Sequence, residues 1–183
     1  MNRFEAMLDP KTVAIIGATE KEGAIGRRML ENLLGLKERK VYPVNPNSKR
    51  VLDVEAYPDI TSVPEQVNLA VIVTPAPTVP ALIQDCGRAG VDGVVIISAG
   101  FRETGEEGRK LEAEIEETRN KYGMRILGPN CLGFARPPIG LNATFLKSDP
   151  PQGNIAFISQ SGALGSATHQ GDKPRVAYPI LQY

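Results

Sequence analysis

Glycines near the start of the chain have the spacing of a phosphate-binding turn. The apolar run Val13–Ile16 is typical of a buried parallel strand, and Gly17 follows where a backbone without a Cβ can turn tightly. Gly26 comes where the next helix must pass close to the strand or to a ligand. Free N–H groups and a partial positive charge at such a helix start attract phosphate. The stretch predicts a nucleotide-type ligand, although a plain strand-to-helix connection would use the same glycines.

The spacing departs from the dinucleotide fingerprint G-x-G-x-x-G. Gly17, Gly23 and Gly26 stand at other intervals, and the loop between them is longer and charged. NAD-binding folds also need a carboxylate at the end of the second strand, where it holds a ribose hydroxyl. Here the predicted strand Val41–Val44 ends without one, and Lys49 follows. This pattern favours a ligand with extra phosphate over NAD.

Composition excludes several classes of function. Lys and Arg together number 21, as do Asp and Glu, so no net charge would gather nucleic acid or an anionic membrane. Cys86 and Cys131 form no C-x-x-C pair, which argues against a disulfide framework and a zinc site. The N-terminal residues lack the apolar core of a signal peptide, and no apolar run approaches the roughly 18 residues that span a bilayer. We expect a soluble, cytoplasmic protein without a metal.

Apolar residues recur along the chain with the periods of helices and strands. Helical spacing predicts helices over 25–36 and 78–89, and a third, densely charged one whose apolar face is Leu111, Ile115, Thr118 and Tyr122. Short apolar runs predict strands at Val41–Val44, Val67–Val73, Val94–Ile97 and Met124–Leu127. Residues 51–66 give weak signals and predict an irregular crossover. The alternation predicts an α/β fold, a Rossmann-type doubly wound parallel sheet with helices on both faces.

Each loop that carries chemically useful residues follows one of these strands. The loops are Gly17–Gly26, Asn45–Lys49, Thr74–Pro77, Ser98–Phe101 and Gly128–Gly133. The carboxyl ends of parallel strands meet at one edge of a sheet, and ligands bind outside that edge. We therefore expect a single site there.

A change of composition predicts a second unit after residue 150. Prolines at 137, 138, 150 and 151 indicate a linker, so residues 1–150 form one predicted domain and 151–183 the start of another. Asn154–Ile158 predicts a new first strand, and Ser159-Gln160-Ser161-Gly162 predicts a second anion-binding turn that opens a helix. Ordinary capping of the helix by serine explains the same residues equally well.

Seven stretches taken in order resemble one protein family. Over residues 8–165 they are VAIIGATEKEGAIG, VYPVNPNSKRVLDVEAYP, VNLAVIVTPAP, GVVIISAGFRETGEEG, RILGPNCLGF, GLNATF and NIAFISQSGALG. They are similar to the CoA-binding alpha portion of the nucleoside-diphosphate-forming acyl-CoA synthetases, which include ADP-forming acetate-CoA ligase and succinyl-CoA synthetase. The resemblance implies a Rossmann-type domain that binds coenzyme A or acyl-CoA, followed by a flavodoxin-like ligase domain.

The resemblance also implies roles for individual residues. It places the CoA diphosphate along Gly17, Thr19, Glu20, Lys21 and Glu22, and it makes Lys49 a cation for the phosphates. It lines the adenosine and pantetheine groove with Thr74, Pro75, Ala76, Ser98, Ala99 and Gly100. The remaining implied cofactor-binding residues are Ala18, Gly26, Asn45 and Pro46. The resemblance also implies that four residues face the phosphoryl-transfer site: Asn130, Ser159, Ser161 and Gly162.

In this family a histidine carries the phosphoryl group between the nucleoside phosphate and the acid, so that an acyl phosphate forms, and CoA then attacks the acyl phosphate and releases phosphate. That histidine lies downstream of the serine turn, and His169 matches no such motif, so we assign no catalytic residue. From about Ala167 the tail, interrupted by Gly171–Pro174 and Pro179, no longer resembles the family. We expect an incomplete second domain that needs a ligase half and an ATP-grasp partner. A face left uncovered in this way would favour a homo-oligomer.

Two other interpretations stay open. A protein-lysine acetyltransferase can carry the same CoA-binding module, and a stand-alone NAD(P)- or nucleotide-sensing module would have no catalysis of its own. Lys49 leaves NADP open as the ligand, so competition between CoA and NADPH for the site would separate a CoA-binding module from an NADP-binding one. Cys131 has no base placed beside it by sequence, and we expect a packed thiol rather than an acyl-carrying nucleophile.

Overall fold

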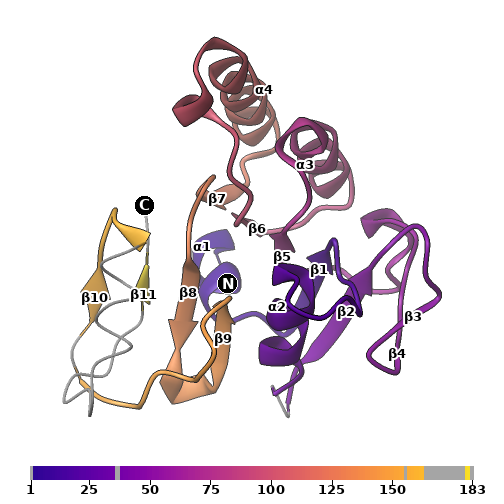
Figure 1. The fold of residues 1–183 in the computed structure, drawn as a ribbon, viewed down its shortest axis with the longest axis vertical. Coiled ribbons are helices and arrows are strands. Elements are labelled where there is room, and N and C mark those ends of the chain that lie inside the picture. Colours follow the sequence, from indigo (N-terminus) through magenta and orange to yellow (C-terminus); the bar gives the residue numbers. More distant parts are fainter. Residues whose placement is uncertain (1, 36–37, 155, 163–179, 182–183) are drawn as a thin grey trace.

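A five-stranded parallel sheet forms the centre of the molecule (Figure 1). The structure is a computed structural model that describes residues 2–35, 38–154, 156–162 and 180–181. The strands of the sheet are β1 (Thr12–Ile16), β2 (Lys40–Val44), β5 (Leu69–Ile72), β6 (Gly93–Ile96) and β7 (Arg125–Leu127). Their spatial order is β2-β1-β5-β6-β7, and every neighbouring pair is parallel. The predicted parallel sheet is confirmed.

The segment after β2 returns to the edge of the sheet and pairs with β2 at a single residue. Tyr57 forms a parallel bridge with Val44. The N–H of Tyr57 donates to the carbonyl of Pro43 at 2.9 Å, and the N–H of Asn45 donates to the carbonyl of Tyr57 at 2.9 Å. If this segment is counted as the third strand along the chain, the order becomes 3-2-1-4-5-6, which is the Rossmann order. The winding reverses between β1 and β5, where folds of this type have their ligand crevice.

Side chains of the strands alternate between two cores. In β1, Val13 and Ile15 enter one core, and Ala14 and Ile16 enter the other. The helices are α1 (Arg3–Leu8), α2 (Ile25–Leu34), α3 (Val79–Arg88) and α4 (Glu106–Tyr122). α1 and α2 cover the first core, and α3 and α4 lie together over the second (Figure 1). Burial on both faces explains why the inner strands β1, β5 and β6 carry no charged residue, whereas the edge strands β2 and β7 begin with the exposed Lys40 and Arg125.

The irregular crossover predicted after β2 contains a short hairpin. Its strands are β3 (Arg50–Val51) and β4 (Val54–Glu55), and the 3-10 turn η1 (Ile60–Ser62) follows. The two residues between the strands, Leu52 and Asp53, have φ angles of 49° and 60°. Two consecutive positive φ angles give the hairpin a type I′ turn.

Prolines 137 and 138 lie within a second hairpin, so the interpretation of this stretch as a linker is wrong. β8 (Gly133–Arg136) and β9 (Leu141–Thr144) pair antiparallel, and η4 (Pro137–Ile139) connects them. Phe134, Leu141 and Ala143 are buried in the core that α2 covers. Proline is tolerated in such a connection because no ladder bond is lost there. The domain boundary at residue 150 stays a prediction.

The remaining elements are short. α1 has a capping box, in which Asn2 accepts the N–H of Glu5 and the carboxylate of Glu5 accepts the N–H of Asn2. Two further 3-10 turns, η2 (Ala76–Thr78) and η3 (Arg102–Thr104), follow the loops after β5 and β6. β10 (Phe157–Ile158), within the predicted strand Asn154–Ile158, pairs in parallel with β11 (Ile180–Leu181). His169 and the predicted tail breaks at 171–174 and 179 lie outside the described residues.

Candidate functional site

The loops that follow the strands begin side by side at one edge of the sheet. Ile16, the last residue of β1, lies opposite both Val44 and Ile72, and Ile72 lies opposite Ile96. Four strands therefore end at the same level. The prediction that their loops meet at one edge is confirmed.

Two glycines allow α2 to start close against β1. Gly17 has φ +97°, and a Cβ there would lie 2.9 Å from Cγ2 of Thr74. A Cβ on Gly26 would lie 2.3 Å from the carbonyl oxygen of Gly17. Gly26 is required because no real Cβ approaches a backbone oxygen so closely, and Gly17 is required because side chains disfavour its left-handed backbone. The start of α2 is thereby held against the turn that follows β1.

Asn45 joins the end of β2 to this turn. Its Nδ2 donates to the carbonyl of Ala18 at 2.8 Å, and its Oδ1 accepts the N–H of Asn47 at 2.8 Å. The N–H of Gly17 donates to the carbonyl of Val44 at 3.1 Å. The segment that carries Pro46 and Lys49, both exposed, is therefore anchored beside the glycine turn.

Polar groups of the charged loop between Gly17 and Gly26 form hydrogen bonds with other parts of the protein. The carboxylate of Glu20 accepts the N–H of Leu52 at 3.1 Å, and the carbonyl of Glu20 accepts Nη1 of Arg27 at 2.6 Å. The N–H of Lys21 donates to Oγ1 of Thr19 at 3.3 Å. Thus Glu20, expected along a diphosphate, uses its carboxylate on the neighbouring hairpin.

The loops after β5 and β6 are tied to each other. The hydroxyl of Ser98 donates to the carbonyl of Thr74. Gly100 has φ +109°, and a Cβ there would lie 3.1 Å from Cβ of Ala76. Oγ1 of Thr78 donates to the carbonyl of Pro75 at 2.7 Å. The six residues predicted to line a groove here, Thr74 to Ala76 and Ser98 to Gly100, therefore do lie on two adjoining loops.

Glu103 connects these loops to the one after β7. Its Oε1 accepts the N–H of Gly100 at 2.7 Å and Nδ2 of Asn130 at 3.1 Å. The N–H of Asn130 donates to the carbonyl of Ser98 at 2.9 Å. The bond from Gly100 holds the pKa of the Glu103 carboxyl below its usual range. Sequence reasoning missed Glu103, because a lone carboxylate in a loop has no distinctive spacing.

A cavity of about 500 Å³ opens among these loops. It is lined by Ile25, Val73, Ile97, Ser98, Ala99, Asn130, Cys131, Leu132, Phe145 and Gly162. Four predicted site residues, Ser98, Ala99, Asn130 and Gly162, are thus brought together. Ser159 and Ser161 bond each other instead, because the N–H of Ser161 donates to Oγ of Ser159 at 3.0 Å.

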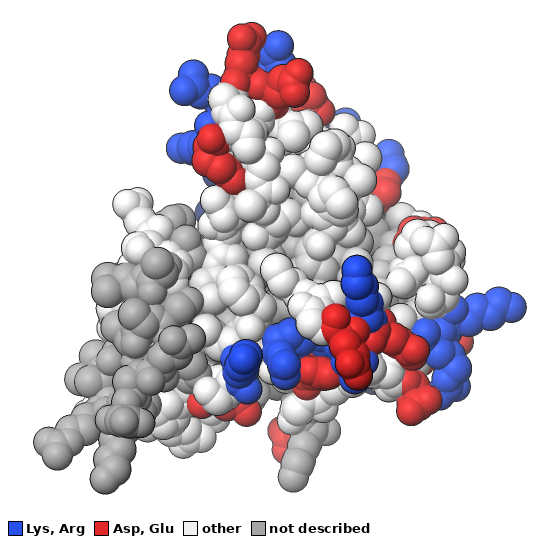
Figure 2. Space-filling view, viewed as in Figure 1, with Lys and Arg blue, Asp and Glu red and all other residues white. Residues whose placement is uncertain are grey.

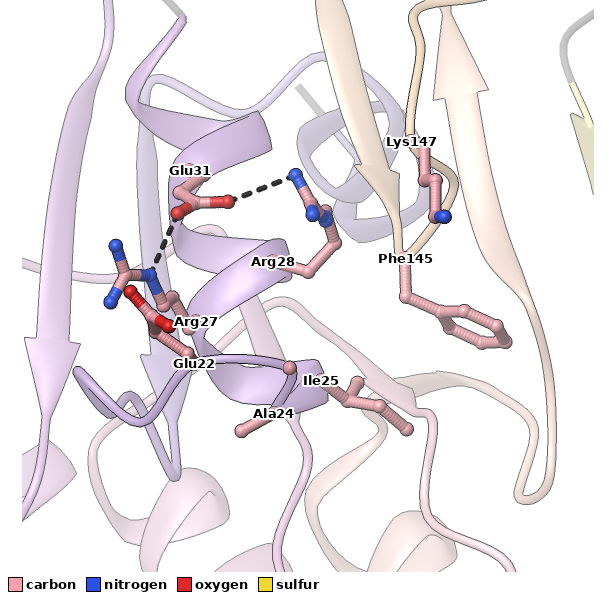
Figure 3. A pocket seen from close by; sticks show the side chains of 9 residues that line it. Glu22, Ala24, Ile25, Arg27, Arg28, Glu31, Phe145 and Lys147 are labelled. Carbon is pink, nitrogen blue, oxygen red and sulfur yellow. Dashed lines mark hydrogen bonds and ion pairs between the residues drawn. The ribbon is translucent and has the colours of Figure 1, made fainter.

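A second cavity of about 480 Å³ adjoins the first and shares Ile25 and Phe145 with it. Its other lining residues are Glu22, Gly23, Ala24, Arg27, Arg28, Glu31 and Lys147. Glu31 lies between the two arginines, at 2.9 Å from Nε of Arg27 and 3.0 Å from Nη1 of Arg28 (Figure 3). Arg28 points from α2 toward the segment of Phe145 and Lys147 (Figure 3).

Asn32 fixes the wall that the two cavities share. From α2, its Nδ2 donates to the carbonyl of Thr144 at 2.7 Å and to the carbonyl of Leu146 at 3.0 Å. Phe145 lies between these two carbonyls. Sequence reasoning missed Arg28, Phe145 and Lys147, although two adjacent arginines in the first turn of a helix after a glycine loop are a usable signal.

The model of one protein family, described as the CoA binding domain, matches residues 11–137. This range runs from β1 through the glycine turn, the Asn45–Lys49 segment and the loops after β5, β6 and β7. The chain belongs to the CoA-binding domain family. The expected ligand, coenzyme A, is confirmed by this match.

Curated and solved relatives agree with the family. The chain is 48% identical over 169 residues to the alpha subunit of ADP-forming acetate–CoA ligase I of Pyrococcus furiosus, covering 90% of this chain and 37% of that one. It is 47% identical over 161 residues to ADP-forming acetate–CoA ligase I of Archaeoglobus fulgidus, covering 88% and 23%. Acetyl-coenzyme A synthetase 1 of Candidatus Korarchaeum cryptofilum, solved with phosphate and ADP, superposes with a TM-score of 0.90 at 41% identity, covering 100% and 39%.

These matches confirm the predicted family, the CoA-binding alpha portion of nucleoside-diphosphate-forming acyl-CoA synthetases, and its Rossmann-type fold. The chain spans 23% to 39% of the length of the three relatives. Which residues contact CoA stays a prediction.

Cys131 lines the first cavity of the CoA-binding domain, but it is not activated. The residue is 4% exposed, and its Sγ lies 3.2 Å from the carbonyl oxygen of Ile96. Burial raises the pKa of this thiol to about 12. A thiol of that pKa is almost entirely protonated near neutral pH, which supports its interpretation as a packed side chain.

Charged side chains on the face shown in Figure 2 gather over α4, around the start of α2 and near the β3–β4 hairpin, with a largely uncharged surface between them. The charged side of α4 is exposed, as predicted for a solvated face. No helix among the described residues is both long and apolar enough to cross a membrane. In the same part of the chain, no three His, Cys, Asp or Glu side chains are grouped so that they could hold a metal ion.

Proposed function

We propose that this domain binds CoA at the carboxyl edge of its sheet as part of an ADP-forming acyl-CoA synthetase. The observation that carries the proposal is the pair of adjoining cavities beside the glycine turn, at the point where the winding of the sheet reverses. CoA is a long ligand with a charged and an apolar end. Its binding site must be equally long, and the two adjoining cavities together provide such a length.

The charges at the site support an orientation for CoA. The start of α2 and the exposed Lys49 offer positive charge beside the glycine turn, so we place the phosphates there. The cavity of Ser98 and Asn130 is less charged and includes apolar walls from Val73 and Leu132. The pantetheine arm and its thiol extend toward this cavity in the proposal.

The parent reaction is proposed to run through an acyl phosphate. The acid and ATP give acyl phosphate and ADP by way of a phosphohistidine, and the CoA thiol then displaces phosphate. Asn130 and Gly162, which line one cavity, would face the acyl phosphate, with Ser159 and Ser161 nearby. This chain supplies the CoA site, and a ligase portion and an ATP-grasp portion supply the phosphoryl chemistry.

Calorimetric titration of the chain with CoA, dephospho-CoA, NADPH and NAD tests the proposal. We expect saturable CoA binding that weakens without the 3′-phosphate, and a loss of about tenfold in Lys49→Ala, since a phosphate contact of one lysine contributes on the order of 1 kcal/mol. Lys110→Ala, which removes an exposed lysine from α4, is the matched control and should bind as the wild type does. Heat from NADPH or NAD but not from CoA would overturn the proposal in favour of a dinucleotide module.

A further inference from the structure

The tip of the β3–β4 hairpin is hydrogen-bonded to the glycine loop, residues Gly17–Gly26. The bond is made by Glu20, a residue expected to contact the ligand. Oε1 of Glu20 accepts the N–H of Leu52 at 3.1 Å, although 32 residues separate them along the chain. The backbone carbonyl of Glu20 accepts Nη1 of Arg27 at 2.6 Å, which fixes the loop to α2. A carboxylate held on the hairpin is also spared direct contact with a phosphate that would repel it.

The hairpin tip has a conformation that its sequence disfavours. Leu52 and Asp53 have φ angles of 49° and 60°, where asparagine and glycine are the usual residues. A leucine in the left-handed region is an outlier that persists only when surrounding contacts determine it. Leu52 has two such contacts, the bond to Glu20 and packing of its side chain against the core near Val51.

Two bonds to the glycine loop bracket Lys49. Four residues before it, Asn45 donates to the carbonyl of Ala18 at 2.8 Å. Three residues after it, Leu52 donates to Glu20. The carbonyl of Lys49 itself accepts the N–H of Ala56 at 2.9 Å, which closes the open end of the hairpin. The backbone of Lys49 is therefore fixed on both sides relative to the turn that would hold the diphosphate.

We propose that Glu20 is a positioning residue, which holds the hairpin so that Lys49 can select the 3′-phosphate of CoA. The inference rests on the proposed CoA site, but it replaces the expected role of Glu20 as a diphosphate contact. Without this bond the hairpin tip loses its hydrogen bond to the loop between Gly17 and Gly26. Lys49 then samples more positions and binds the phosphate less well.

The test compares affinities for CoA and dephospho-CoA in Glu20→Ala and Glu20→Gln. The amide oxygen of glutamine can accept the same N–H, so Glu20→Gln should keep the preference for CoA. We expect Glu20→Ala to reduce that preference about fivefold, which is part of the roughly tenfold effect of Lys49 through which it acts. Glu114→Ala, on the exposed side of α4, is the control for removing a carboxylate. If both Glu20 variants bind CoA more tightly, Glu20 acts by charge repulsion and the inference is wrong.

Two further measurements separate this inference from the proposed function. In a Lys49→Ala background, Glu20→Ala should not change the preference any further, because its effect passes through Lys49; a second loss of equal size would overturn the inference. Hydrogen exchange at the Leu52 amide, measured without ligand, should speed up in Glu20→Ala and stay slow in Glu20→Gln. Unchanged exchange in Glu20→Ala would refute the bond itself even if CoA binds. A wild-type chain that does not bind CoA would refute the proposed function.

Discussion

The glycine turn follows β1 and the Ser98–Gly100 loop follows β6, with β5 between the two strands, and these two ends of the site are held in different ways. At the first end, Gly26 packs on the carbonyl of Gly17, and Gly17 packs on Thr74. At the second end, the hydroxyl of Ser98 donates to the carbonyl of Thr74, and the carboxylate of Glu103 accepts the N–H of Gly100 in its own loop and Nδ2 of Asn130 in the next. One end is built by close packing around the glycines and the other by side-chain hydrogen bonds, of which those of Glu103 are exposed.

The two ends should differ in the substitutions and the changes of pH that they tolerate. Backbone atoms packed against backbone atoms cannot rearrange cheaply, so a single added methyl group has a large effect. Exposed hydrogen bonds exchange with water, and each contributes little net stability. We therefore expect the glycine-turn end to be rigid and the Ser98–Gly100 end to yield to small changes of sequence and pH.

Gly26→Ala should have the largest effect. The new Cβ would lie 2.3 Å from the carbonyl oxygen of Gly17, so α2 must move away from β1. Overpacking of this kind costs about 2–3 kcal/mol, which outweighs the roughly 1 kcal/mol that alanine gains over glycine within a helix. Thermal unfolding should show a Tm lower by about 5 °C, and calorimetry should show a loss of CoA binding.

Gly23→Ala is the matched control for that change. Gly23 lies in the same loop with φ +76°, but a Cβ there would meet nothing within 4 Å. Only the cost of the left-handed backbone applies, about 1 kcal/mol. Equal losses in the two variants would show that backbone packing is not what distinguishes this end of the site.

Asn32→Ala should have an intermediate effect, because it acts on the wall between the two cavities. The change removes both bonds that fix the backbone on either side of Phe145. We expect a loss of about 1 kcal/mol in the free energy of unfolding by urea and weaker CoA binding. Asn120→Ala, at an exposed position on α4, should leave both unchanged. Normal CoA affinity in Asn32→Ala would show that the wall does not need this support.

Sequence reasoning succeeded where a residue type is dictated by backbone geometry. The positive φ of Gly17 and the close approach at Gly26 leave a glycine pattern that can be recognised directly. The unbroken apolar strands and the exposed side of α4 are also local properties, and they were predicted with errors of one or two residues at most ends.

Contacts between distant parts of the chain could not be predicted in this way. Asn32 reaches Thr144, 112 residues away, and Glu20 reaches Leu52. Neither pairing has a periodic pattern, since one hydrogen bond can form wherever the fold brings a donor and an acceptor together. The β8–β9 hairpin was missed because Pro137 and Pro138 suit a linker and a hairpin connection equally well.

Glu103→Gln should have the smallest effect and should appear mainly as a change in pH dependence. The N–H of Gly100 keeps the pKa of the Glu103 carboxyl below its ordinary value of 4.5, so the folded state prefers the carboxylate. This contribution is present above the unfolded pKa and is lost as the pH falls through the lower folded pKa. Urea unfolding between about pH 5 and pH 3 should show a shallower loss of stability in Glu103→Gln. Glu114→Gln should keep the slope of the wild type. A wild-type slope in Glu103→Gln would mean that the bonds from Gly100 and Asn130 do not stabilise this end of the site, and the contrast with the glycine turn would then rest on packing alone.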